Sequence, residues 1–159
     1  MLSRLTLCCV ALLVVAGCRA REVEHDLALT DVETGWYDVG IVDGLNKLVP
    51  SVTLSLENVS SEPIARVQLN AVFRLVGEDQ EWDSHFTRGI GPDGLGPGGV
   101  TDPLVMRSER GYTGADQTRQ QMLQNSQFVD ARVEIFGKHG RRQWVKIGEY
   151  QIDRQLLTR

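Results

Sequence analysis

A strict alternation of apolar and polar residues in 64–75 is the feature that most limits what this chain can fold into. In the stretch IARVQLNAVFRL, apolar residues recur at every second position, and most of the residues between them are polar or charged. Side chains of a β-strand point alternately to opposite faces, so this pattern predicts a half-buried strand. The face expected in the core comprises Val67, Leu69, Ala71, Phe73 and Leu75.

Other segments repeat this period of two. In 51–58 the residues Val52, Leu54 and Leu56 alternate with polar ones, and the turn-forming sequence NVSSEP separates this segment from the first. Strands are also expected at 81–90, 102–108, 128–136 and 142–152, the last two as a hairpin around GKHGR, with Val133 in the core. One more strand is expected around GWYD.

The segment 81–90 carries both rings and ionisable groups. Trp82, Phe86 and Ile90 alternate there with Asp83 and His85, so the apolar set is expected on the core side. Glu81, Asp83 and His85 project to one side of such a strand and are weak candidates for a divalent metal site. The alternative is a solvent-facing strand beside an acidic turn, because one strand offers too few ligands for a closed site.

One stretch, YTGADQTRQQMLQNS, lacks alternation and is rich in helix-forming residues. It predicts one short helix near 115–125, with a capping-box-like start at Thr113 and Asp116. Met122 and Leu123 are expected to lie against the sheets. Together these elements predict a mainly β fold, an antiparallel sandwich of six to seven strands, with a small β-barrel as the alternative.

The order of elements over roughly 50–107 resembles that of immunoglobulin-like modules found in secreted and lipoprotein chains, including the FxLYD type. The shared order is strand, turn, strand, glycine-proline loop and strand. The chain departs from the Phe-x-Leu-Tyr-Asp signature, since Val76 and Gly77 follow Phe73-Arg74-Leu75. The resemblance implies an immunoglobulin-like sandwich and no particular activity.

The beginning of the chain predicts export. Arg4 precedes an uncharged apolar run over 5–16, which is too short to span a bilayer and has the length of a signal-peptide apolar region. The residues Val15-Ala16-Gly17-Cys18 end this run, and they resemble the lipobox of bacterial lipoproteins. All three cysteines lie within the first eighteen residues, so Cys18 is the only thiol expected to remain after processing.

The lipoprotein resemblance implies that Cys18 carries diacylglycerol and, commonly, an acyl chain on its freed amine. Cleavage before Cys18 leaves 142 of the 159 residues. The expected division is a signal peptide over 1–17, a lipidated tether over 18–32 and a sandwich domain over 33–159. The implied location is the cell envelope, facing the periplasm and anchored to a membrane by lipid. Arg19 favours the outer membrane, because an aspartate there favours inner-membrane retention in enterobacterial lipoproteins.

The charge is uneven along the chain and is interpreted first as solvated surface, whereas the motifs point to binding rather than catalysis. Residues 18–83 contain 13 acidic and 5 basic side chains, a net charge of −8, whereas 132–159 contain 7 basic and 3 acidic, a net charge of +4. No Gly-x-Ser-x-Gly or His-Glu-x-x-His motif is present. We expect a non-enzymatic envelope module without a cofactor and without nucleic acid, and with an unidentified envelope protein as its partner. The alternatives are a periplasmic carrier of a ligand or metal and an envelope hydrolase.

Two groups of residues are candidate binding surfaces. Lys138, Arg141 and Arg142 lie at the tip of the last expected hairpin, beside Trp144, where they are suited to anionic lipid or to an acidic partner. The alternative is a solubilising turn. Trp36 and Tyr37 are adjacent aromatics, and on a strand one of them must point outward while the other enters the core.

Overall fold

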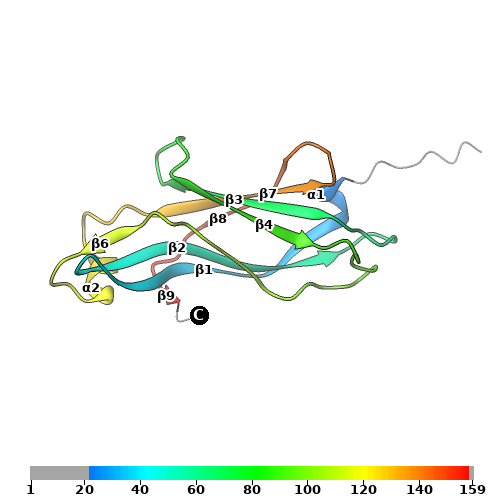
Figure 1. The fold of residues 1–159 in the computed structure, drawn as a ribbon. Coiled ribbons are helices and arrows are strands. Elements are labelled where there is room, and N and C mark those ends of the chain that lie inside the picture. The colour runs from blue at the N-terminus through cyan, green and yellow to red at the C-terminus, as the bar shows by residue number, and fades with distance from the viewer. Residues whose placement is uncertain (1–21, 158–159) are drawn as a thin grey trace, which may run out of the picture.

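The structure, a computed structural model, describes residues 22–157 as two sheets with two very short helices (Figure 1). The elements are α1 Val23–Asp26, β1 Leu27–Val42, β2 Leu45–Asn58, β3 Val67–Leu75, β4 Asp83–Ile90, β5 Leu104–Arg107, β6 Tyr112–Gly114, α2 Arg119–Gln124, β7 Ala131–His139, β8 Val145–Gln151 and β9 Leu156–Leu157. The expected signal segment 1–17 and Cys18 lie outside the described residues, so both stay predictions. Within 22–157, neither helix is long and apolar enough to cross a membrane.

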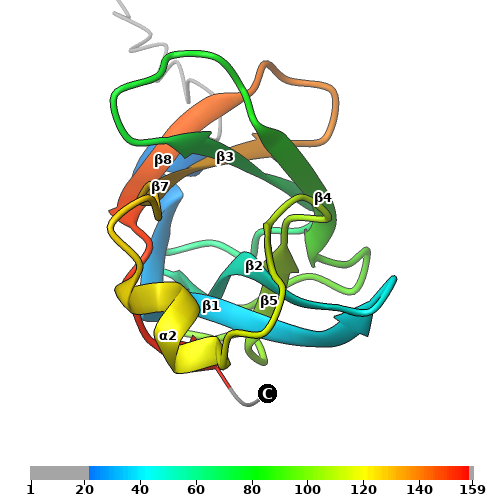
Figure 2. The ribbon, with the colours of Figure 1, turned by 90° about the vertical axis from the view of Figure 1, so that its left-hand side faces the viewer.

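The two sheets pack face to face as a sandwich (Figure 2). One sheet has five strands, ordered β5-β2-β1-β9, with β6 also pairing with β2, and the other has the order β4-β3-β7-β8. All pairs are antiparallel except β1 with β9. The expected sandwich is therefore confirmed, and the barrel alternative is wrong because the strands form two separate sheets. The strand number exceeds six to seven because β6 and β9 have three and two residues, too few to show a period.

A long hairpin of β1 and β2 forms the centre of the five-stranded sheet. The two strands are joined by Asp43 and Gly44 alone, with φ of 51° and 80°. Two-residue hairpin turns of this kind need positive φ at both positions, and Asp-Gly meets that need at low cost. The strand expected around GWYD is confirmed as part of β1, which runs for 16 residues.

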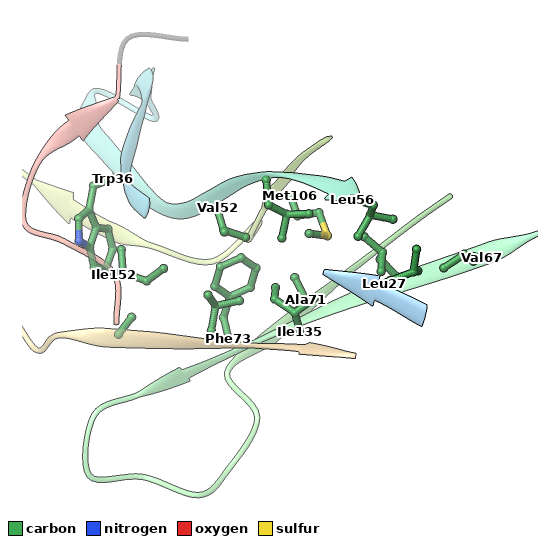
Figure 3. Close-up of a cluster of buried hydrophobic side chains, with 14 of the residues drawn as sticks. Leu27, Trp36, Val52, Leu56, Val67, Ala71, Phe73, Met106, Ile135 and Ile152 are labelled. Atoms are coloured by element: carbon green, nitrogen blue, oxygen red, sulfur yellow. The ribbon is translucent and has the colours of Figure 1, made fainter. Parts of the chain in front are cut away.

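Alternating apolar residues of β2, β3 and β7 meet between the sheets, around Phe73 (Figure 3). Eight residues expected in the core are fully buried, namely Val52, Leu54, Leu56, Val67, Leu69, Ala71, Phe73 and Val133. Leu75, at the end of β3, is only half-buried. The apolar face of the central strand was thus predicted correctly from its alternation alone.

The predicted helix exists, but its start was predicted wrongly. α2 occupies Arg119–Gln124, and Met122 and Leu123 are buried as expected. The capping box is formed by Thr118 and Gln121, each side chain accepting a hydrogen bond from the other's backbone N–H. Thr113 instead belongs to β6, where it pairs with β2, so it is not available to cap the helix.

The tether expected over 18–32 is wrong for its second part. α1 and the first residues of β1 occupy 23–32, and Val23 and Leu27 are 4% and 6% exposed. A Cβ on Gly137 would lie 2.6 Å from Val23 Cγ1, so this glycine leaves the space that Val23 fills against β7. Leu29 and Val32 also pack against the core, and residues 27–30 pair with β2, so this segment is part of the sandwich.

Candidate binding surface

Basic and aromatic side chains gather on the outer face of the four-stranded sheet, at the end that carries the β7–β8 hairpin. The strand register places Arg88 of β4 and Lys138 of β7 on either side of Gln68 of β3. Phe86 lies on the same face, two residues before Arg88 on β4. The hairpin tip is held there by Gly140, whose backbone N–H donates to the carbonyl of Arg66 at 3.0 Å. We call this set the basic–aromatic surface: Arg66, Phe86, Arg88, Lys138, Arg141, Arg142 and Trp144.

Trp144 is the centre of this surface. Its ring lies 5.8 Å from the Phe86 ring, centroid to centroid, at an edge-on angle of 66°. The Lys138 ammonium lies 4.9 Å from the Trp144 centroid, within range of a cation–π attraction. Residues of β4, β7 and the hairpin thus line one open depression of about 480 Å³. Phe86 remains 65% exposed, which is unusual for so large an apolar group.

On the far half of the same sheet face, the basic side chains form ion pairs with neighbouring carboxylates, which neutralise their charge. Glu134 accepts a hydrogen bond from Arg74 at 2.9 Å, and its carboxylate also lies 3.3 Å from Arg132 and 3.5 Å from Lys146. Burial of Glu134 works against its ionisation, but these cations outweigh that effect and lower its pKa. Glu149 pairs with both Arg132 and Lys146 and extends the network.

The basic–aromatic surface has no such compensation. Among residues 22–157, no carboxylate lies within ion-pair distance of any of its five basic side chains, which are Arg66, Arg88, Lys138, Arg141 and Arg142. The positive charge at this end of the sheet is therefore available to an anionic partner. Glu22 and Glu24 lie nearby, lining a depression with Arg141 and Arg142, and both approach His25 within 4 Å.

The structure brings together four of the six residues expected at a binding surface and separates the other two. Lys138, Arg141, Arg142 and Trp144 share the hairpin end, as their closeness in sequence required. Trp36 is fully buried in the five-stranded sheet. Tyr37 is half-buried beneath the Arg107 guanidinium, 3.5 Å from its ring centroid. The expected division of this pair between core and surface is confirmed, but neither residue contributes to the basic–aromatic surface.

Sequence reasoning missed Phe86 because the faces of β4 were assigned in reverse. Asp83, His85 and Thr87 pair opposite the buried residues of β3, so they point inward and Phe86 points outward. The strand is at the edge of its sheet, where polar inward side chains can reach the other sheet rather than a closed core. A register shift between Val67 and Gln68 then returns Ile90 to the core, where it is 4% exposed.

The three weak metal candidates do not converge. Glu81 is exposed and precedes the strand, while Nδ1 of His85 lies 3.0 Å from the Arg107 carbonyl of β5. Asp83 accepts hydrogen bonds from the 108–110 segment instead. In the described part of the chain, the group of side chains close enough to share an ion is Glu22, Glu24 and His25, at the start of α1, all of them exposed.

Asp83 is a link between the two sheets. Its Oδ2 accepts from Ser108 Oγ and Glu109 N, both at 2.7 Å, and from Arg110 N at 3.2 Å, while its Oδ1 accepts from Ser84 N at 2.8 Å. Desolvation of Asp83 raises its pKa, but these four hydrogen bonds outweigh that effect and lower the pKa below 3.8. The folded state therefore favours the ionised form of the Asp83 carboxylate.

The substitution Asp83→Asn is expected to lower the free energy of unfolding by about 1–3 kcal/mol at neutral pH, because an amide has one acceptor oxygen and turns a donor toward backbone N–H groups. Because the pKa of Asp83 is lowered in the folded state, the difference in free energy of unfolding between wild type and variant is present above pH 3.8. This difference is lost as the pH falls through the folded-state pKa of Asp83. Urea denaturation of both proteins across this range measures the difference.

The control for this experiment is Glu81→Gln, which removes an exposed carboxylate two residues away. It is expected to change the free energy of unfolding by less than about 0.5 kcal/mol at any pH. An equal loss in both variants, or a loss at Asp83 that does not depend on pH, would contradict the role given to the Asp83 carboxylate.

A second cluster of aromatic rings lies inside the opposite end of the sandwich. Trp36 packs against Phe128 and Tyr112 at ring-centroid distances of 4.6 and 5.6 Å. Tyr112 and Phe128 also line an open cavity of about 280 Å³ beside Met122 of α2. The Trp36 indole N–H is buried and has no hydrogen-bond partner among residues 22–157. Because the rings of each pair are closely packed, we interpret this cluster as part of the hydrophobic core.

Comparison with known proteins assigns the chain to no family. No protein-family model and no curated protein matches it. A Northeast Structural Genomics Consortium target called SoR45 is similar with a TM-score of 0.43 and 9% identity, over 82% of this chain and 89% of that one. A protein from Archaeoglobus fulgidus is similar with a TM-score of 0.43 and 15% identity, over 82% of this chain and 100% of the other. Similarity at this level carries no argument about fold or activity.

Proposed function

We propose that this chain is a bacterial lipoprotein, held in the cell envelope by lipid on Cys18, whose β-sandwich works by binding an anionic partner. The lipobox-like Val15-Ala16-Gly17-Cys18, placed after a charged start and a short apolar run, supports the anchor. Arg19 supports the outer membrane, with the domain facing the periplasm. Two or three acyl chains on one cysteine anchor a protein durably, because each buried CH₂ contributes about 0.8 kcal/mol.

The observation that supports the binding role is the basic–aromatic surface. Arg88 and Lys138 line one depression together with two rings, Phe86 and Trp144. Arg66, Arg141 and Arg142 flank it, and among residues 22–157 none of the five basic side chains pairs with a carboxylate. Strands β4 and β7 fix the backbone positions of Phe86, Arg88 and Lys138, so binding at these residues requires no ordering of the backbone. Unpaired charges attract an oppositely charged partner and speed the encounter, while exposed aromatic rings contribute contact area.

The anchor is tested by the substitution Cys18→Ser. This change is expected to abolish durable membrane association, so that the protein accumulates as uncleaved precursor or appears soluble if another peptidase cuts it. The core residues are supplied by 23–157, so the midpoint of chemical denaturation should not change. Membrane fractionation and mass spectrometry of the N-terminal peptide measure both the location and the modification.

Cys9→Ser is the matched control, because it removes a thiol from the expected signal peptide and leaves the lipobox-like residues in place. This variant is expected to be lipidated and membrane-bound like the wild type. Mature wild-type protein with an unmodified Cys18 would overturn the lipoprotein proposal.

A further inference from the structure

We propose that the basic–aromatic surface is itself a membrane contact, which lies against anionic lipid head groups of the bilayer that holds the Cys18 anchor. This inference rests on the proposed lipid anchor for its geometry and on the surface for its chemistry. It adds a second attachment that would fix the orientation of the sandwich on the membrane. A lipid anchor alone leaves a domain free to rotate about its tether.

The length of chain before the domain brings this surface close to the anchor. The structured part begins at α1, so only residues 19–21 separate Cys18 from Glu22. Four peptide steps span at most about 14 Å when fully extended. A cysteine held at a membrane surface therefore keeps Glu22 within about that distance of the head groups.

α1 lies at the same end of the sandwich as the β7–β8 hairpin (Figure 1). Glu22 and Glu24 line one depression together with Arg141 and Arg142 of the hairpin tip, so the chain enters the domain directly beside this tip. The outer face of the four-stranded sheet, from which the hairpin rises, is thus the face that a short tether can bring against the bilayer (Figure 2).

The chemistry of the surface matches a membrane interface. Basic side chains near a bilayer are attracted to anionic head groups, and tryptophan favours the membrane–water interface. Phenylalanine is among the apolar residues that interfacial segments bury at the boundary between head groups and acyl chains. Here Trp144 and the 65% exposed Phe86 lie among Arg88 and Lys138, so both kinds of contact are offered by one face. Arg19 and Arg21 add two basic residues to the short segment that leads to it.

The test uses a chain that begins at residue 18 and carries Cys18→Ser, which keeps the whole described fold and removes the lipid. Its binding is measured by co-sedimentation with vesicles of phosphatidylcholine alone and with vesicles that contain about one third phosphatidylglycerol. Binding to the anionic vesicles is expected to be at least about tenfold stronger, and to weaken when salt is raised from about 0.05 M to about 0.5 M.

Arg141→Gln with Arg142→Gln is expected to weaken binding to anionic vesicles by roughly 10- to 30-fold, from the attraction lost per basic residue. Lys47→Gln with Arg110→Gln removes the same charge from the other end of the molecule and is expected to have little effect. Phe86→Ser should also weaken binding, because it removes the exposed ring. All three variants should keep the denaturation midpoint of the parent chain, since they alter surface side chains.

Equal binding to neutral and anionic vesicles, or equal losses in the two double variants, would overturn the inference. Absence of binding to either vesicle would also overturn it and would favour an acidic protein as the partner of this surface. Because the chain tested carries no lipid, these outcomes are independent of whether Cys18 is modified in the cell. The fate of Cys18 is read separately, from its mass spectrum.

Discussion

Replacement of Phe73 by alanine is expected to lower the free energy of unfolding by about 3–5 kcal/mol. The Phe73 side chain is fully buried on β3 and lies at the centre of the core, between the two sheets (Figure 3). Its removal leaves a cavity bounded by residues of several strands, which cannot all move inward without disturbing their sheets. Equilibrium denaturation with urea gives the loss as the shift in midpoint multiplied by the m-value.

Phe86→Ala is the matched control, because it removes the same side chain from a neighbouring strand of the same sheet. Phe86 is 65% exposed and points away from the core, so its loss is expected to cost less than about 1 kcal/mol. If Phe86→Ala destabilised the protein as much as Phe73→Ala, the two faces of β4 would have been assigned incorrectly. A loss below about 1 kcal/mol for Phe73→Ala would contradict the position of the core.

The second large effect is expected for Gly111→Ala, at a point where two backbones approach each other. A Cβ at this position would overlap the carbonyl oxygen of Leu48 and would lie 2.8 Å from both the carbonyl carbon of Leu48 and Val49 Cγ1. The oxygen belongs to the backbone of β2, which is paired on both sides, so it cannot withdraw without disturbing the sheet. We expect a loss of about 3 kcal/mol or more in the free energy of unfolding.

Gly96→Ala is the control for this substitution. No heavy atom lies within 4 Å of a Cβ built on Gly96, and its φ is not in the left-handed region, so alanine is expected to be neutral or slightly stabilising. Thermal denaturation of the two variants beside the wild type separates them. Similar midpoints for Gly111→Ala and the wild type would show that the 108–111 segment does not pack against β2 as described.

The sequence by itself determined the strands that have an apolar and a polar face and lie in the middle of a sheet. β3 was predicted with the correct faces because a central strand must bury its apolar side, and a shift of one residue would expose it. The same holds for Met122 and Leu123, which are the apolar residues of α2. The basic hairpin tip was predicted because Lys138, Arg141, Arg142 and Trp144 are near neighbours in the chain.

Other features depended on contacts between distant segments, and only the tertiary structure decided them. The inward side of β4 followed from Asp83 reaching the backbone of 108–110, an interaction between residues that are 25 or more positions apart. The start of the sandwich at α1 followed from the space left beside Gly137. Phe86 and Arg88 joined Trp144 through the register of three strands. Alternation defines two faces of a strand, but which face is buried depends on the sheet that packs against it.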